Sequence, residues 1–340
     1  MKISVMGFKS SKLIVFILLL GYFQKGNAQG FVPLFNEYLS ENLYVIHPAM
    51  VGTNLINFRL NLGSRQQWFN IPEAPGTDLL TLEYKATRNV IIGMQFIKDH
   101  NGYHSKNSTY ATFGYRIYFN EEVWKTKRSF PTKNDNIKEL SFGLSVGSIK
   151  YDLDQSSYDP RISDPLLNNN SSGIGYTTID AGIAYVSTHL SGQLTIKNIT
   201  LNNTKSSIEE DIVSFESTRF KHYLASLQYE IYFDNGWNIE PSILIQHLEK
   251  TDESSLDLNL KLYRIINKGR LWVGGSYRRN FIEIETNSIP RTPNQFYSHF
   301  TPVFGLNYGR YLFSYHYTSN LGTLNLGASG LHYFTVGISF

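Results

Sequence analysis

The sequence predicts an all-β protein, a transmembrane up-and-down antiparallel β-barrel of about 14 strands. Three observations support this prediction: an N-terminal stretch typical of a secretory signal, a period of two through most of the remaining chain, and joins that alternate between short and long. Closing so long a sheet into a barrel also removes its two exposed edges.

The first 28 residues predict a signal peptide. Lys2, Lys9 and Lys12 precede an apolar stretch, residues 13–23, that is too short to span a bilayer, and residues 26–28 (GNA) offer a cleavage site. A retained anchor helix is the alternative, which the length of the apolar stretch disfavours. Removing these residues takes away four lysines and no acidic residue, leaving 27 basic against 28 acidic residues. No basic patch for nucleic acid is expected.

The composition excludes several kinds of site. The chain has no cysteine, which argues against a disulfide framework, a cysteine-ligated zinc site and an iron–sulfur cluster. After the signal, no apolar run is long enough for a membrane-spanning helix. We expect no cofactor and no metal ion.

The strands are read from strict alternation of apolar and polar residues. In residues 255–262, four leucines face one way, while Asp257, Asn259 and Lys261 face the other. Such segments are close to the ten or so residues that a tilted strand needs to cross a membrane. We predict strands over 53–63, 76–86, 87–98, 106–119, 138–151, 174–187, 191–200, 218–233, 236–249, 253–266, 269–281, 297–307, 310–318 and 331–340.

The joins predict an orientation. Those after even-numbered strands are mostly short, with hairpin sequences such as Asn235-Gly236, whereas those after odd-numbered strands are mostly longer and polar. Residues 120–137, a long basic join, break the pattern. If the mature N-terminus is periplasmic, the long joins are extracellular and both termini lie in the periplasm. Residues 29–52 are then a periplasmic or lumenal segment, and residues 53–340 form the barrel.

Periodicity alone does not say which face meets lipid, because a soluble sandwich has the same pattern. The signal, the join lengths, the absence of helical segments and an aromatic content of 14% favour the barrel. Charges on the predicted lumenal faces have mixed signs, which suggests a satisfied network rather than a selectivity ring. They are Arg59, Glu83, Arg116, Glu230, Glu240, Asp257, Lys261 and Arg278.

No catalytic set emerges, so we predict that the protein is not an enzyme. Residues 143–147 (GLSVG) match the nucleophile-elbow pattern, but they lie within an alternating strand with no helix after them. We interpret them as a coincidence of strand composition. His100 and His104 are interpreted as loop residues rather than metal ligands. A lipid-active barrel enzyme would need a Ser or His pair on the lipid-facing wall.

Residues 43–77 carry the most distinctive motifs. They resemble the opening of the PorP/SprF family of outer-membrane proteins, in which N-P-A-x-x-G is followed by R-x-Q-W and A-P-x-T. His47 stands where the family has Asn. The resemblance covers roughly residues 36–340. The matching positions are Pro48, Ala49, Gly52, Arg65, Gln67, Trp68, Ala74, Pro75 and Thr77.

The resemblance implies an outer-membrane accessory of type IX secretion in Bacteroidetes. It implies that the barrel assists export or surface anchoring of a secreted cargo, such as a gliding adhesin, by protein binding. Partners would be outer-membrane lipid, the cargo and periplasmic secretion components. We expect Arg65, Gln67 and Trp68 in the first outer loop, where they contact cargo or fold inward as a partial plug. The alternative function is a general solute channel.

Overall fold

The computed structural model describes residues 36–54, 57–67, 73–120, 136–154, 174–200, 220–249, 253–281, 298–321 and 330–340. The predicted signal peptide lies outside these residues. Three short 3₁₀ helices come first: η1 (Glu37–Ser40), η2 (Leu43–Val45) and η3 (Pro48–Met50). Within the described residues, none of the helices is long and apolar enough to cross a membrane.

The rest of the described chain is mainly β-strand. The strands are β1 (Phe58–Gln67), β2 (Gly76–Lys85), β3 (Val90–Asn101), β4 (His104–Tyr118), β5 (Lys138–Leu153), β6 (Ile174–Ser187), β7 (Leu190–Thr200), β8 (His222–Tyr229), β9 (Ile231–Tyr232), β10 (Trp237–Leu248), β11 (Ser254–Ile266), β12 (Gly269–Phe281), β13 (Ser298–Tyr308), β14 (Tyr311–Asn320) and β15 (Leu331–Ser339).

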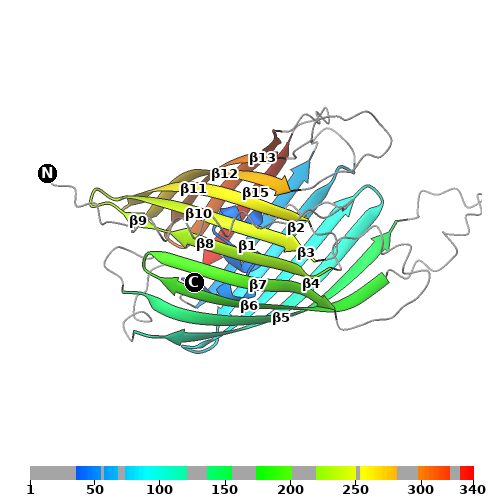
Figure 1. Ribbon diagram of the computed structural model, residues 1–340, viewed down its shortest axis with the longest axis horizontal. Helices are drawn as coiled ribbons and strands as arrows, with labels where there is room; N and C mark the ends of the chain where they lie inside the picture. Colours follow the sequence, from blue (N-terminus) through cyan, green and yellow to red (C-terminus); the bar gives the residue numbers. More distant parts are fainter. Residues whose placement is uncertain are drawn as a thin grey trace, which may run out of the picture.

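These strands form one closed antiparallel barrel (Figure 1). Each strand pairs with its sequence neighbours, and β15 pairs with β1 to complete the circle. β8 and β9 both pair with β10 and are two parts of one strand, interrupted at Glu230. The barrel therefore has 14 strands around its circumference, and the predicted fold is confirmed.

The first strand begins later than predicted. Residue 53 was expected to open it, but Thr53 and Asn54 belong to a turn that follows η3, and β1 starts at Phe58. Gly52 and Asn54 have φ of 69° and 55°, and the Thr53 amide donates to the Met50 carbonyl. Thr53 and Asn54 therefore belong to a turn rather than to the strand, because left-handed residues are incompatible with a regular strand.

The two ends of the barrel differ. Short joins after β2, β6, β9, β11 and β13 gather at one end, here called the short-join end, where β15 also finishes. Gly236 and Gly309 supply the positive φ that tight turns require. At the opposite, long-join end, the β3–β4 join has only residues 102–103, which is shorter than the alternation suggested. Residues 121–135 of the basic join lie outside the described residues.

The barrel is apolar outside and polar inside. On β11, Leu258 and Leu260 are 47% and 55% exposed, whereas Asp257 and Lys261, which point inward, are only 1% and 6% exposed. A soluble sandwich would bury the leucines. The reverse arrangement places them against lipid and the charges in the lumen, as membrane barrels require.

Candidate functional site

A segment of the chain lies inside the barrel. Residues 36–54, here called the plug, comprise η1, η2, η3 and their connecting turns, drawn in blue within the barrel (Figure 1). Most of the plug is buried, with only Asn54 exposed. The plug contacts inward-facing residues on strands around the circumference, so the lumen is occupied.

Local sequence explains the compact path of the plug. Glu41 adopts the left-handed conformation (φ 67°) after η1 and turns the chain. Pro48 opens η3, where a missing amide proton costs nothing, and Gly52 ends the turn after it. A Cβ at Gly52 would lie 2.7 Å from the Ile91 side chain, so the close approach to β3 also requires glycine.

One plug carboxylate is held by two cations. Glu41 accepts hydrogen bonds from Lys261 Nζ (2.7 Å) and from Arg270, on β11 and β12, and from the Tyr263 hydroxyl (2.9 Å). Burial alone would raise the pKa of Glu41, but Arg270 and Lys261 outweigh it and lower that pKa to about 2. Glu41 therefore stabilises plug docking above its ordinary pKa, and the stabilisation is lost only as pH falls toward 2.

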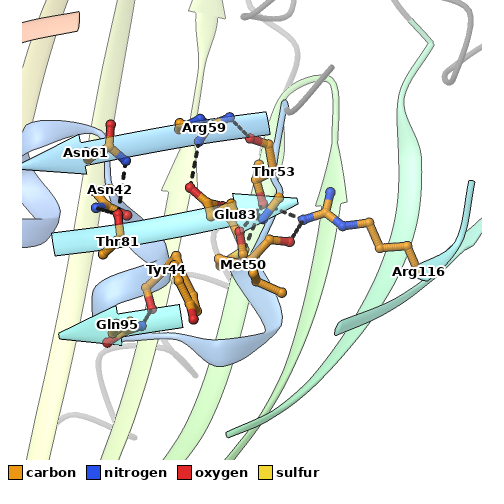
Figure 2. A network of polar contacts seen from close by, with 12 residues as sticks. Asn42, Tyr44, Met50, Thr53, Arg59, Asn61, Thr81, Glu83, Gln95 and Arg116 are labelled. Carbon is orange, nitrogen blue, oxygen red and sulfur yellow. Dashed lines mark hydrogen bonds and ion pairs between the residues drawn. The ribbon is translucent and has the colours of Figure 1, made fainter. Parts of the chain in front are cut away.

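A second cluster fixes the end of the plug. Arg116, on β4, pairs with Glu139 (2.7 Å) and donates to the Val51 carbonyl (2.6 Å) and Thr53 Oγ1 (2.8 Å). The Gly52 amide donates to Glu83. Figure 2 shows Arg116 and Arg59 reaching Thr53 from different strands. Four hydrogen bonds with strand residues thus hold this turn, which fixes the position of the chain before β1.

Neutral hydrogen bonds fill the space between these clusters. Asn42 donates to Thr81 on β2, and Gln95 on β3 donates to the Tyr44 carbonyl (Figure 2). The Tyr44 hydroxyl donates to Thr112 on β4. All five side chains are buried. Because buried polar groups are costly unless paired, these bonds specify one orientation of the plug.

His47 is buried between two hydroxyl groups. Its Nδ1 lies 2.8 Å from Thr195 Oγ1 on β7, and its Nε2 lies 2.8 Å from Ser226 Oγ on β8. Lys197 donates to the neighbouring Val45 carbonyl. Burial, with a further contribution from the Lys197 charge, lowers the pKa of His47 to about 3. His47 is therefore neutral when the plug is docked.

This histidine should make plug docking sensitive to pH. The docked pKa is below the ordinary value of 6.5, so a released plug binds an extra proton at intermediate pH, and docking weakens as pH falls below 6.5. Between pH 8 and pH 5 we expect a loss of about 2 kcal/mol. Hydrogen exchange of the plug amides at both pH values measures it. His47→Asn should remove most of the difference, and an unchanged difference in that variant would contradict the assignment.

The motif residues Pro48 and Ala49 pack on a groove of small residues. A Cβ on Gly143 of β5 would collide with the backbone of Pro48 and Ala49, and Gly182 of β6 lies beside Ala49. Gly143 belongs to the GLSVG stretch, which the sequence explained only as strand composition. The structure gives it a role, since the absence of a side chain admits η3.

Gly143→Ala should displace the plug. The added methyl group meets backbone rather than a flexible side chain, and overpacking of this kind costs between about 1 and 3 kcal/mol. Because the chain has no cysteine, Ala49→Cys supplies a single thiol, buried when the plug is docked. Its labelling should be several-fold faster with Gly143→Ala. Gly192→Ala, where the nearest atom is 3.5 Å away, is the matched control and should not accelerate labelling.

The R-x-Q-W residues are not in the first outer loop as expected. β1 begins and ends later than predicted, so Arg65 and Gln67 lie within it. Arg65 faces the lumen. Arg65 Nη1 pairs with Glu37 of the plug (2.9 Å), and its Nη2 bonds Thr77 Oγ1 on β2 (2.5 Å). Thr77 in turn donates to Asp99 on β3. Residues of both motifs thus belong to one network, here called the latch, which joins Glu37, Arg65, Thr77 and Asp99 and holds the start of the plug.

The remaining motif positions are spread around this latch. The Gln67 amide donates to the Pro75 carbonyl (3.0 Å), and Ala74 is buried beside it. Trp68 lies outside the described residues. Sequence reasoning missed Glu37, Glu41 and Arg270. Glu37 and Arg65 are 28 residues apart and Glu41 and Arg270 are 229 apart, and nothing in a single sequence links such pairs.

Most of the predicted lumenal charges form ion pairs of opposite sign. Arg278 forms two hydrogen bonds of 2.6 Å with Asp257, and the Tyr38 hydroxyl of the plug donates to the same carboxylate. Arg59 pairs with Glu83 at 3.5 Å. The network interpretation is therefore correct for these residues, and a ring of one sign is not what they form.

A Ser–His pair does occur on the outward face. His247 Nδ1 lies 3.0 Å from Ser254 Oγ across β10 and β11. Ser254 is buried, and the nearby Glu249 is bonded to Lys221 and Tyr223. In the described part of the chain, no group of three or more His, Asp or Glu is placed to hold a metal.

The fold and the plug define an integral membrane β-barrel whose lumen is occupied by its own N-terminal region. A family model described as "Type IX secretion system membrane protein PorP/SprF" matches residues 27–338. The chain therefore belongs to the PorP/SprF family of type IX secretion, and it is an outer-membrane protein.

Several solved structures have distant similarity to this chain. The TodX deltaS2S3 mutant monoaromatic hydrocarbon channel has a TM-score of 0.48 at 9% identity, covering 87% of this chain and 93% of its own. BamA from Haemophilus ducreyi lacking POTRA domains 1-3 has a TM-score of 0.42 at 10% identity. The match covers 84% of this chain and 70% of the BamA chain. CdiB from Acinetobacter baumannii has a TM-score of 0.41 at 10% identity. The match covers 84% of this chain but only 60% of the length of CdiB. No curated protein matches the chain.

Proposed function

We propose that this barrel is an accessory of type IX secretion that assists export or surface anchoring of a secreted cargo, such as a gliding adhesin, by binding proteins and without catalysis. The observation that carries the proposal is the plug, which is anchored by ion pairs and hydrogen bonds to strands around the barrel. A barrel closed in this way is suited to work through its two ends rather than as a conduit.

The family supports the same proposal. Membership of PorP/SprF gives the pathway, whereas cargo binding is our inference from the closed lumen. We further propose that the termini are periplasmic and that the long joins face the cell exterior, which is the usual arrangement of bacterial barrels. The general solute channel is disfavoured, because it needs an open lumen.

Gene deletion tests the proposal directly. In the deletion strain, we expect loss of one or a few type IX cargo proteins from the cell surface, with their accumulation inside the cell. A plasmid copy of the wild-type gene should restore them. An unchanged surface proteome would overturn the proposal, and so would a defect confined to uptake of small solutes.

Affinity purification from outer membranes identifies the partner. The full-length protein, with an exposed tag in a loop, should retain a type IX component or cargo through detergent extraction. The plug variant Gly143→Ala provides a comparison, since partners that depend on the docked plug should be lost from it.

A further inference from the structure

A cavity of 170 Å³ lies at the short-join end of the lumen. The plug forms one side of it, and the β6–β7 join and the ends of β8, β10, β12 and β15 form the other. The volume exceeds that of several water molecules, at about 30 Å³ each, so a long side chain fits within it. The latch, the bonds of Lys261 and Arg270 to Glu41, and the groove under η3 explain how the plug is held. They do not explain why this cavity is present.

Two carboxylates of the lining are bonded mainly to neutral groups. Glu230, at the break between β8 and β9, accepts from the Tyr232 hydroxyl (2.9 Å) and Asn238 Nδ2 (3.0 Å). Glu240, on β10, accepts from the Tyr263 hydroxyl (3.1 Å). Both are half-buried and line the cavity. They therefore remain open to a further donor.

The cations that line the same cavity already have partners. Lys261 and Arg270 share Glu41, and Arg59 pairs with Glu83 and donates to the Thr53 carbonyl. Lys261 and Arg270 therefore both bond a carboxylate of the plug. Among the residues that the structure describes, no lysine or arginine hydrogen-bonds Glu230 or Glu240 directly.

Two buried amides add to this set of acceptors. Asn42 of the plug and Asn61 of β1 both line the cavity, and both donate to Thr81 (Figure 2). Each is less than 5% exposed, and no described residue hydrogen-bonds the Oδ1 atom of either. Buried acceptors without a partner indicate a missing donor.

From these observations we propose that the short-join mouth binds an arginine or lysine side chain presented by a partner polypeptide. A guanidinium or ammonium group supplies several donors and a positive charge, and a carboxylate pair at the mouth of a cavity recognises both properties. The site itself is inferred from the cavity. The proposed function is needed only to say that the partner polypeptide is a type IX cargo or component.

Peptide binding to the purified barrel tests the site. The probes are the blocked tripeptide Gly-Arg-Gly and its citrulline analogue, titrated calorimetrically against the full-length protein in nanodiscs. We expect binding of the arginine peptide and none of the neutral citrulline peptide. Substituting both acids, with Glu230→Gln and Glu240→Gln, should weaken binding about ten-fold or more, since each charge-assisted bond removed is worth about one such factor.

The controls separate the site from general electrostatics. Glu249→Gln removes an exposed carboxylate at the opposite end and should leave binding unchanged. If the double variant does not fold, Glu230→Gln alone serves, and folding is checked by heat-modifiable migration. Equal binding of citrulline, indifference to the substitutions, or binding of calcium but not arginine would each overturn the inference. Absence of arginine-peptide binding to the wild-type barrel, together with normal cargo export, would refute this site and leave the proposed function standing.

Discussion

Deleting residues 36–52 should turn a silent barrel into an ion-conducting pore. The plug occupies the lumen of a 14-strand barrel, and barrels only slightly larger leave an aqueous channel when nothing fills them. In planar bilayers we expect on the order of ten-fold more conductance than the intact protein shows. Single-channel recording at matched protein amounts measures the difference.

The deleted barrel should still fold. Its strand ladder closes without the plug, and water entering the lumen would solvate the inward-facing charges that the plug now covers. Heat-modifiable migration checks folding, and a synthetic peptide of residues 36–52 should lower the conductance again. A correctly folded deletion variant that stays silent would mean that the inward side chains close the lumen by themselves.

The second large effect is expected at Glu41. In the docked plug, Glu41→Gln leaves Lys261 and Arg270 without the carboxylate that they share, and breaking a buried ion pair from one side costs about 3–5 kcal/mol. The result should be release of the plug at lower denaturant concentration. Labelling of Ala49→Cys across a urea series measures the free energy of docking.

Two comparisons make this prediction specific. Glu249→Gln removes an exposed carboxylate and should leave the urea midpoint of plug release unchanged. Lys261→Met combined with Glu41→Gln should recover part of the loss, because one unpaired cation is removed. A loss below about 1 kcal/mol for Glu41→Gln alone would show that water reaches these cations in the docked state.

The strand pattern was readable because lipid and lumen impose opposite demands on alternate residues. Thirteen of the 14 predicted strands overlap the observed ones closely, from 76–86 against Gly76–Lys85 to 331–340 against Leu331–Ser339. The exception is the first strand, where the turn at Gly52 and Asn54 interrupts the alternation. A left-handed residue has no signature in a period of two.

The terminal strand illustrates what periodicity can support. Phe334 and Val336 were expected on the lipid face, and they are exposed on the outer wall. Pairing of β15 with both β14 and β1 keeps this end ordered, and Phe340 packs beside Phe58 at the closing seam. Closure followed from the edge argument, since a sheet of this length leaves two edges to protect.

The sequence by itself determined the barrel, the side that meets lipid and, through its motifs, the family. Only the tertiary structure decided that the lumen is plugged, because an open and a plugged barrel have the same alternation and the same polar interior. Arg65 and Glu37, Glu41 and Arg270, and Gly143 and Pro48 are neighbours only once 14 strands close around residues 36–54. Barrel closure brings together residues that are distant in sequence, and local patterns carry no record of those contacts.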